Sequence, residues 1–159
     1  LKGNLHGGAN EKVMAMLQDI ATPARAEPYL MDLLKRKEKV MGFGHRLYTK
    51  GDSRSDIMWD YGQQLAEKFR TPLWHEISEV LQAVMLREKK LFANLDFPAA
   101  SAYKLMGIET QLYTPLFASS RIAGWSAHII EQQNNNRIIR PSCLYTGPET
   151  RLYTPIDQR

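Results

Sequence analysis

The spacing of apolar residues is the feature that most constrains the fold of this chain. Apolar residues recur three and four positions apart along most of the sequence, as on one face of an α-helix, and no alternating strand pattern persists. The first such run, from Val13 to Ile20, follows Asn10, a residue type that often caps helix starts. The spacing predicts an all-α chain, with helices over about residues 10–20, 28–37, 53–69, 72–85, 98–106 and 114–133.

Two of the predicted helices have distinctive faces. The helix over 53–69 places five large residues on one face, namely Ile57, Met58, Tyr61, Leu65 and Phe69. In the helix over 114–133, small residues such as Ala118 and Gly124 lie between large apolar ones, which predicts close helix packing inside a large core. From residue 137 onward the periodicity weakens and three prolines predict an extended tail.

Composition and charge exclude several classes of protein. With 159 residues, 43% hydrophobic and 24% charged, the chain fits about one globular domain rather than a disordered segment. The single Cys143 cannot form an internal disulfide, which favours a reducing compartment such as the cytoplasm. No apolar run approaches the roughly 20 residues that span a bilayer, so we expect no membrane partner. The net charge of +4 comes without a basic stripe or an aromatic platform, so we expect no nucleic-acid partner.

The first ten residues are unusual for the start of a chain. The sequence begins at Leu1 without Met or a signal pattern, and then enters a polar, glycine-rich cluster over residues 4–10. We therefore expect this sequence to be the C-terminal part of a longer polypeptide.

Two of the four histidines lie among glycines in predicted loops. Glycine lets the backbone approach a ligand closely, and polar residues on such loops often carry function, so His6 and His45 are candidate catalytic groups. The loop over residues 42–47 is not a nucleotide-binding G-x-G-x-x-G, because its sixth position is Leu47. A Rossmann site is therefore not expected.

Asp96 and three arginines are further candidates. Asp96 lies between apolar neighbours at a predicted helix break, where partial burial would make it a better base near neutral pH; alternatively, it caps the helix that opens at Pro98. Arg54, Arg121 and Arg140 could grip carboxylates with their guanidinium forks. For Arg121, which lies on an apolar helix, an internal salt bridge is the alternative.

The segments over residues 5–11 (LHGGANE), 42–48 (GFGHRLY) and 94–97 (NLDF) resemble the three signature segments of citrate synthases. Arg121 and Arg140 also stand where that family keeps two substrate arginines. The resemblance covers nearly the whole chain in order. Within the family, the HGGANE, GFGHR and NLDFPAASAY forms are most similar to 2-methylcitrate synthases and to bacterial enzymes that accept both propionyl-CoA and acetyl-CoA.

The resemblance implies a fold and an assembly. It implies a helical homodimer whose subunits each have a large and a small domain. Residues 1–9 would end a large-domain segment, residues 10–98 would form the small, mobile domain, and residues 99–159 would be the C-terminal part of the large domain with its tail. A large N-terminal part of the family's chain has no counterpart here, which agrees with the expectation of a longer polypeptide.

The resemblance also implies catalytic roles in joining an acyl-CoA to oxaloacetate, with hydrolysis to 2-methylcitrate or citrate. Asp96 would remove the proton alpha to the thioester carbonyl, and His6 would hydrogen-bond that carbonyl oxygen. His45 would donate to the keto oxygen of oxaloacetate. A two-His-one-carboxylate iron site of the same three residues is an alternative, but the family matches around all three disfavour it, so no metal is expected.

Substrate contacts follow from the same resemblance. Arg54 and Arg121 would hold the carboxylates of oxaloacetate, and Arg140 would reach the neighbouring subunit's site. At Arg54 the family has Asp-Pro-Arg, and this chain has Ser53 in place of the proline. The CoA thioester, a substrate rather than a resident cofactor, would bind along Lys39, Val40, Met41, Gly42, Phe43 and Arg46.

Two alternatives remain open at the level of function. One is a citrate synthase proper, which uses acetyl-CoA; an apolar pocket discriminates one methylene by only about 1–3 kcal/mol, so mixed specificity is also compatible. The other is a non-catalytic helical module that binds CoA or a partner.

Overall fold

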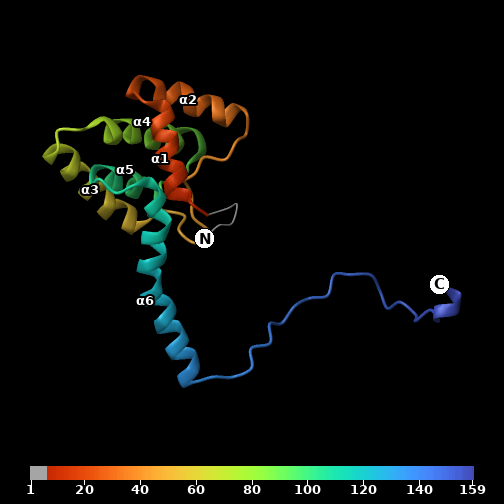
Figure 1. Cartoon of the computed structure of the whole chain (residues 1–159). Coiled ribbons are helices and arrows are strands. Elements are labelled where there is room, and N and C mark those ends of the chain that lie inside the picture. Colours follow the sequence, from red (N-terminus) through yellow and green to blue (C-terminus); the bar gives the residue numbers. More distant parts are fainter. Residues whose placement is uncertain (1–6) are drawn as a thin grey trace. The chain divides into compact units, whose positions relative to one another are not determined.

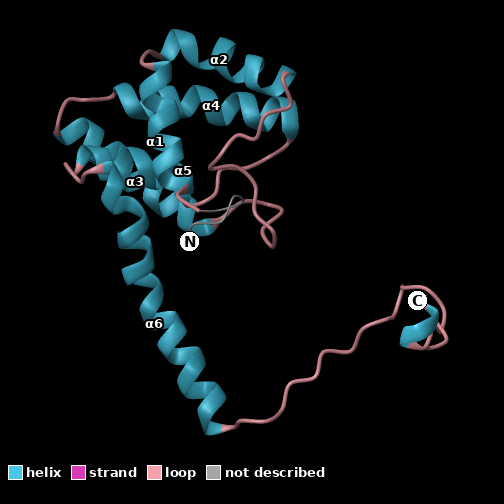
Figure 2. Cartoon of the chain, turned by 45° about the vertical axis from the view of Figure 1, so that its right-hand side comes forward, coloured by secondary structure: helices cyan, strands magenta, loops and turns pink. Residues whose placement is uncertain are grey.

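The computed structural model describes residues 7–159, which are almost entirely helix and loop (Figures 1 and 2). The elements are α1 (Ala9–Ile20), α2 (Pro23–Lys35), α3 (Ser53–Lys68), α4 (Leu73–Lys89), α5 (Asp96–Leu105), η1 (Thr110–Leu112), α6 (Tyr113–Asn134) and η2 (Ile156–Gln158). Within residues 7–159 no strand forms, and the one extended pairing is an isolated bridge between Phe43 and Ala93. The all-α prediction is confirmed.

The chain divides into two compact units. The first ends at Gly124 and holds α1 to α5 with the start of α6, and the second runs over Trp125–Arg159. The division into a small domain over residues 10–98 and large-domain segments on either side stays a prediction. No helix in the described part of the chain combines the length and the apolar character needed to cross a bilayer.

The core of the first unit is built around α1, which contacts α2, α4 and α5. The side chains that α1 buries recur at helical spacing, as predicted: Val13, Met14, Leu17 and Ile20 all have no exposed surface. They pack with Leu30 of α2, Leu81 of α4 and Phe97 of α5. Full burial of such side chains stabilises a fold by about 1.5–3 kcal/mol each, so this cluster fixes how the other helices surround α1.

α2 begins earlier than the sequence predicted. It starts at Pro23 rather than at Pro28, and Pro28 lies inside the helix. Pro23 takes the first turn, where a missing N–H costs nothing. The predicted start was wrong because a proline is usually excluded from a helix interior, whereas the exposed Pro28 is accommodated here.

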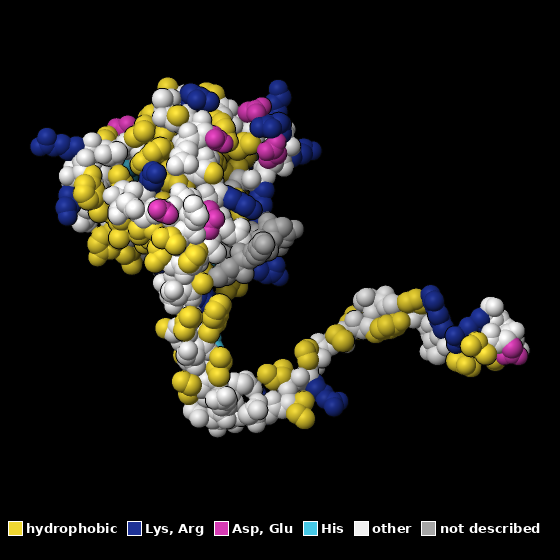
Figure 3. Space-filling model, in the orientation of Figure 1, with side chains coloured by type: hydrophobic (Ala, Val, Ile, Leu, Met, Phe, Trp, Pro, Cys, Tyr) yellow, Lys and Arg dark blue, Asp and Glu magenta, His cyan; other side chains and the backbone are white. Residues whose placement is uncertain are grey.

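The fully buried residues of α3 are small, while its large Trp59 is partly buried against the core. A Cβ placed on Gly62 would lie 4.0 Å from the Ala102 Cβ of α5, so the two helices meet closely. The buried residues of α3 are Ser55, Gly62 and Ala66. On the predicted apolar face, Ile57 is 60% and Tyr61 is 59% exposed, and hydrophobic side chains gather visibly on the surface of this unit (Figure 3).

α6 begins in the core of the first unit, and its residues in the second unit are exposed. Tyr113 is fully buried and its hydroxyl donates to the Ala100 carbonyl at 3.3 Å. Farther along, Trp125, Ile129 and Ile130 are 48%, 56% and 57% exposed. The close packing predicted for this helix is therefore not made by the described residues of the same chain. The tail beyond residue 135 is extended up to η2, as predicted.

The loop between α2 and α3 pairs with the segment between α4 and α5. The Gly44 N–H donates to the Phe92 carbonyl at 2.8 Å, and the Asn94 N–H donates to the Gly42 carbonyl at 2.9 Å. This pairing surrounds the Phe43–Ala93 bridge. It brings two segments that are about fifty residues apart in sequence to one place.

The pairing requires a glycine at position 42. Gly42 has φ +88°, and a Cβ there would lie 2.8 Å from Val13 Cγ2 and 2.9 Å from Phe97 Cδ2. Real Cβ atoms do not approach other atoms so closely, and both neighbours belong to the core. Gly107 provides a comparison, because its φ is +76° but a Cβ there would have no neighbour within 4 Å.

We predict that Gly42→Ala destabilises the protein by roughly 2–4 kcal/mol, the sum of left-handed strain and a core clash. Gly107→Ala should cost only the strain, about 1–2 kcal/mol. Thermal unfolding of the full-length polypeptide that carries this sequence measures both. Equal losses for the two variants would contradict the close approach at Gly42.

Candidate active site

One cavity in the first unit brings together most of the residues singled out in the sequence. Its volume is about 690 Å³, and it is lined by the loop over 39–48, the beginnings of α1, α3 and α5, and part of α6. Four predicted catalytic or oxaloacetate-binding residues line it: His45, Arg54, Asp96 and Arg121. All the predicted CoA contacts line it too: Lys39, Val40, Met41, Gly42, Phe43 and Arg46. The predicted residues in this cavity therefore come from four separate parts of the sequence.

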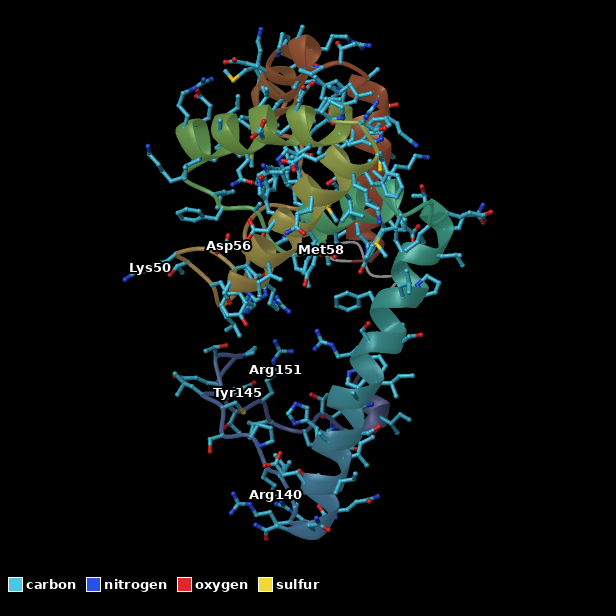
Figure 4. The ribbon with its side chains drawn as sticks, turned by 90° about the vertical axis from the view of Figure 1, so that its left-hand side faces the viewer. Lys50, Asp56, Met58, Arg140, Tyr145 and Arg151 are labelled. Atoms are coloured by element: carbon cyan, nitrogen blue, oxygen red, sulfur yellow. The ribbon has the colours of Figure 1, made fainter. Side chains whose placement is uncertain are left out.

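Two predicted residues are not placed in this cavity. His6 lies outside the described residues. Arg140 belongs to the second unit, in the extended segment after α6, and its side chain is exposed (labelled in Figure 4). The roles expected of these two residues stay predictions.

The imidazole of His45 is oriented by the backbone of its own loop. Its Nδ1 accepts the N–H of Leu47 at 3.1 Å and the N–H of Tyr48 at 3.2 Å. A nitrogen that accepts hydrogen bonds carries no proton, so these bonds select the neutral tautomer with its hydrogen on Nε2. The ring also stacks on Tyr48, with centroids 4.2 Å apart and planes at 17°. These contacts hold the ring so that its Nε2 side is available to a ligand.

Asp96 is the first residue of α5 and is only 7% exposed. The N-cap position belongs to Leu95, and the Asp96 N–H donates to Asn94 Oδ1 at 3.0 Å. The alternative that Asp96 caps this helix, and the predicted helix start at Pro98, are therefore wrong. Since Asn94 satisfies the backbone at the helix start, the Asp96 carboxylate does not have to cap it.

Asn94 joins the segments that carry His45 and Asp96, a role that we did not predict. Its side-chain amide donates to the Gly44 carbonyl at 2.9 Å, while its Oδ1 accepts from Asp96. One side chain therefore connects the peptide before His45 with the helix start that carries Asp96. The sequence held a signal for this role, an asparagine two positions before the candidate base.

Asp52 is a second residue beside the cavity that we did not single out in the sequence. It caps α3, as the predicted start of that helix requires, and is 3% exposed. Its carboxylate accepts Arg54 Nε at 2.9 Å and Arg54 Nη2 at 2.8 Å. These hydrogen bonds hold the Asp52 pKa below its usual value, although burial opposes the shift. The same pair raises the pKa of Arg54, with a smaller contribution from the charge of Asp96.

Arg121 reaches the cavity from α6. Its guanidinium carbon lies 5.3 Å from the centroid of the Phe117 ring, which lines the same cavity, and not against a carboxylate of the described residues. The alternative of an internal salt bridge is therefore not observed in residues 7–159. Arg46 and Arg54 line the same cavity, so three guanidinium groups face it, and those of Arg54 and Arg121 suit a ligand with two carboxylates.

Comparisons with known proteins give the family context of this geometry. Residues 1–142 match the family model for the citrate synthase C-terminal domain. Over its full 159 residues the chain is 48% identical to citrate synthase 2 of Bacillus subtilis and 48% identical to the 2-methylcitrate synthase of Shewanella oneidensis. It spans 43% and 42% of those proteins, less than half their length.

A solved structure is similar over the same extent. It is the ternary complex of carboxymethyl coenzyme A and oxaloacetate with the citrate synthase of Thermoplasma acidophilum. The TM-score is 0.80 at 37% sequence identity, and the match covers all of this chain and 44% of that one.

We predict that Asp52→Asn lowers stability at neutral pH by about 1–3 kcal/mol, the usual contribution of hydrogen bonds to a charged group. A depressed folded-state pKa stabilises the fold above the unfolded value and ceases to do so as pH falls through the folded value. The difference from the wild type should therefore shrink below about pH 4. Melting temperatures of the full-length polypeptide between about pH 7 and pH 3 check this. A difference that does not change with pH would refute it.

Proposed function

The chain belongs to the citrate synthase family, and on that basis we propose that the full-length protein joins an acyl-CoA to oxaloacetate and hydrolyses the adduct to 2-methylcitrate or citrate and free CoA. One observation carries this proposal. The carboxylate of the buried Asp96, the imidazole of His45 and the guanidinium groups of Arg54 and Arg121 line a single cavity. These groups match the needs of a carbon-carbon bond formation between a thioester and a keto diacid.

The first step is the removal of a proton. Asp96 takes a proton from the carbon alpha to the thioester carbonyl, and His6 donates a hydrogen bond to the carbonyl oxygen on which negative charge develops. The burial of Asp96 suits this role, because a desolvated carboxylate is a stronger base. A donor at the enolate oxygen contributes about 3–4 kcal/mol in a water-excluded site.

The second step forms the new bond. The alpha carbon attacks the keto carbon of oxaloacetate, and the electron pair of the keto C=O bond moves onto its oxygen. The Nε2–H of His45 points its proton to that oxygen, since Nδ1 is occupied by backbone donors. Water then cleaves the thioester of the adduct and releases CoA.

Arginine side chains orient oxaloacetate. Arg54 and Arg121 bind the carboxylates of oxaloacetate, and Arg140 adds a contact in the neighbouring subunit of a cytoplasmic homodimer. CoA lies along the loop from Lys39 to Phe43, with Arg46 near its phosphates. The exposed loop amides and basic side chains there suit a phosphate-bearing ligand.

The acyl group distinguishes the two enzyme types in this family. We propose propionyl-CoA as the preferred substrate, which would assign the protein to propionate catabolism, with acetyl-CoA and the tricarboxylic acid cycle as the alternative. The experiment is release of free CoA by the full-length polypeptide with oxaloacetate and either thioester. We expect kcat/KM for propionyl-CoA to exceed that for acetyl-CoA by about tenfold, the scale of one methylene in an apolar pocket.

The same assay separates the competing functions. A higher kcat/KM for acetyl-CoA would make the protein a citrate synthase proper. Binding of CoA without release from either thioester would favour the non-catalytic module.

We predict that Asp96→Asn lowers kcat for CoA release by about 10²–10⁴-fold, the usual contribution of a positioned base. Asparagine keeps the shape of the side chain and cannot take the proton. Oxaloacetate affinity, measured by calorimetry, should stay near the wild-type value because the arginines are intact. Asp60→Asn, an exposed carboxylate on α3, is the control and should leave kcat unchanged. Equal kcat for Asp96→Asn and the wild type would exclude Asp96 as the base.

A further inference from the structure

We infer that Asp52 is a positioning residue that ties the oxaloacetate-binding arginine to the segment carrying the catalytic base. The inference rests on the proposed function, since it concerns how Arg54 and Asp96 are held for that reaction. Asp52 itself does not line the cavity that holds those two side chains. It therefore acts through its neighbours rather than on the substrates.

The Asp52 carboxylate makes contacts on two sides. Oδ1 accepts the Arg54 N–H at 3.1 Å and Arg54 Nε at 2.9 Å. Oδ2 accepts Arg54 Nη2 at 2.8 Å and the Leu95 N–H at 3.3 Å. Leu95 is forty-three positions away in sequence and directly precedes Asp96. One carboxylate thus bridges the start of α3 and the start of α5.

On the arginine side, the contact fixes the direction of the guanidinium group. The Asp52 side chain is 2% exposed and that of Arg54 is 44% exposed, so a buried anchor holds a partly open cation. Asp52 uses Nε and Nη2, and a guanidinium group has five N–H donors, so a second carboxylate can bind at Nη1. The Arg54 guanidinium carbon also lies 5.6 Å from the centroid of the Tyr48 ring, the ring that stacks on His45.

On the base side, the contact fixes the peptide before Asp96. Leu95 is the N-cap of α5, and its backbone N–H donates to Asp52, which lies outside that helix. A misplacement of about 1 Å can cost a catalytic group 10²-fold in rate. Asp52 therefore affects both the binding of oxaloacetate and the rate of proton removal.

A purely structural role makes a different prediction. A helix cap needs one oxygen to accept an N–H near the helix start, and Oδ1 does this for Arg54. Asparagine and serine serve equally well as caps. The contacts of Oδ2 with Arg54 Nη2 and Leu95 N–H add nothing to capping. Variants that keep the cap and lose the ionised fork therefore separate the two roles.

The experiment compares Asp52→Asn and Asp52→Ser with the wild type in the CoA-release assay of the full-length polypeptide. Asp56→Asn is the matched control, because Asp56 is an exposed carboxylate in the first turn of the same helix (Figure 4). It removes the same charge from the same helix end and touches neither Arg54 nor Leu95.

We expect both Asp52 variants to raise KM for oxaloacetate about tenfold and to lower kcat about tenfold or more. KM for the acyl-CoA should change by less than about twofold, because no CoA contact depends on Asp52. In an Arg54→Ala background, Asp52→Asn should add little to KM for oxaloacetate, since the residue acts through Arg54. Asp56→Asn should match the wild type in every constant.

Several outcomes would overturn the inference. It fails if the Asp52 variants fold and keep wild-type constants, if kcat falls and KM for the acyl-CoA rises as much as KM for oxaloacetate while the melting temperature drops, or if neither variant folds. In the last two cases Asp52 has a structural role only. A full multiplicative effect in the Arg54→Ala background would show that Asp52 does not act through Arg54.

The proposed function fails separately. If the wild type releases no CoA, calorimetry with oxaloacetate replaces the assay. Binding that is weakened by Asp52→Asn and not by Asp56→Asn then supports the inference without the reaction. No binding by the wild type would overturn both proposals.

Discussion

The close approach of the 42–44 loop to the core is the contact on which the site depends. Gly42 lies against Val13 and Phe97 where no side chain fits, and its carbonyl pairs with the Asn94 N–H. This contact holds the loop that carries His45 beside the start of α5, which carries Asp96. The packing of the core therefore also fixes the position of the His45 loop, because Val13 and Phe97 belong to the core and contact Gly42.

Hydrogen bonds then refine the positions that packing establishes. Asn94 connects the backbone of the histidine loop with the start of α5, and Asp52 connects the start of α3 with the same place. Both side chains bind backbone groups across large sequence separations. The side chains that line the cavity therefore come from helix starts and from a short paired loop. Among the described residues, every buried side-chain nitrogen and oxygen has a hydrogen-bond partner.

Sequence periodicity predicted most helices because their buried faces are built from local spacing, as in α1. It failed at the start of α2, where proline can stand either in the first turn, as Pro23 does, or inside the helix, as Pro28 does. It also gave no guide to the packing of α3, whose fully buried residues are small. The periodic pattern in the sequence comes from the large residues, whereas the buried residues of α3 include the small Gly62 and Ala66.

Some residues of the candidate site could be recognised in the sequence, and others could not. Glycine-flanked histidines and the isolated Asp96 were visible in sequence because their local context is unusual, and the arginines drew attention by their charge. Asp52 was not visible as more than a helix cap, because its second role depends on Leu95, which only the fold brings near. A partner forty-three residues away leaves no mark on the local pattern.

The arrangement of helix starts around the cavity has an electrostatic consequence. Ala9, Arg54 and Asp96 lie in the first turns of α1, α3 and α5, and all three line the cavity. Each helix start carries a partial positive charge of roughly half an elementary charge from its backbone dipoles. Unlike an ammonium or imidazolium group, a peptide dipole has no proton to lose. Part of the attraction that this cavity exerts on anions is therefore built into the main chain, and no change of pH that leaves the fold intact can remove it.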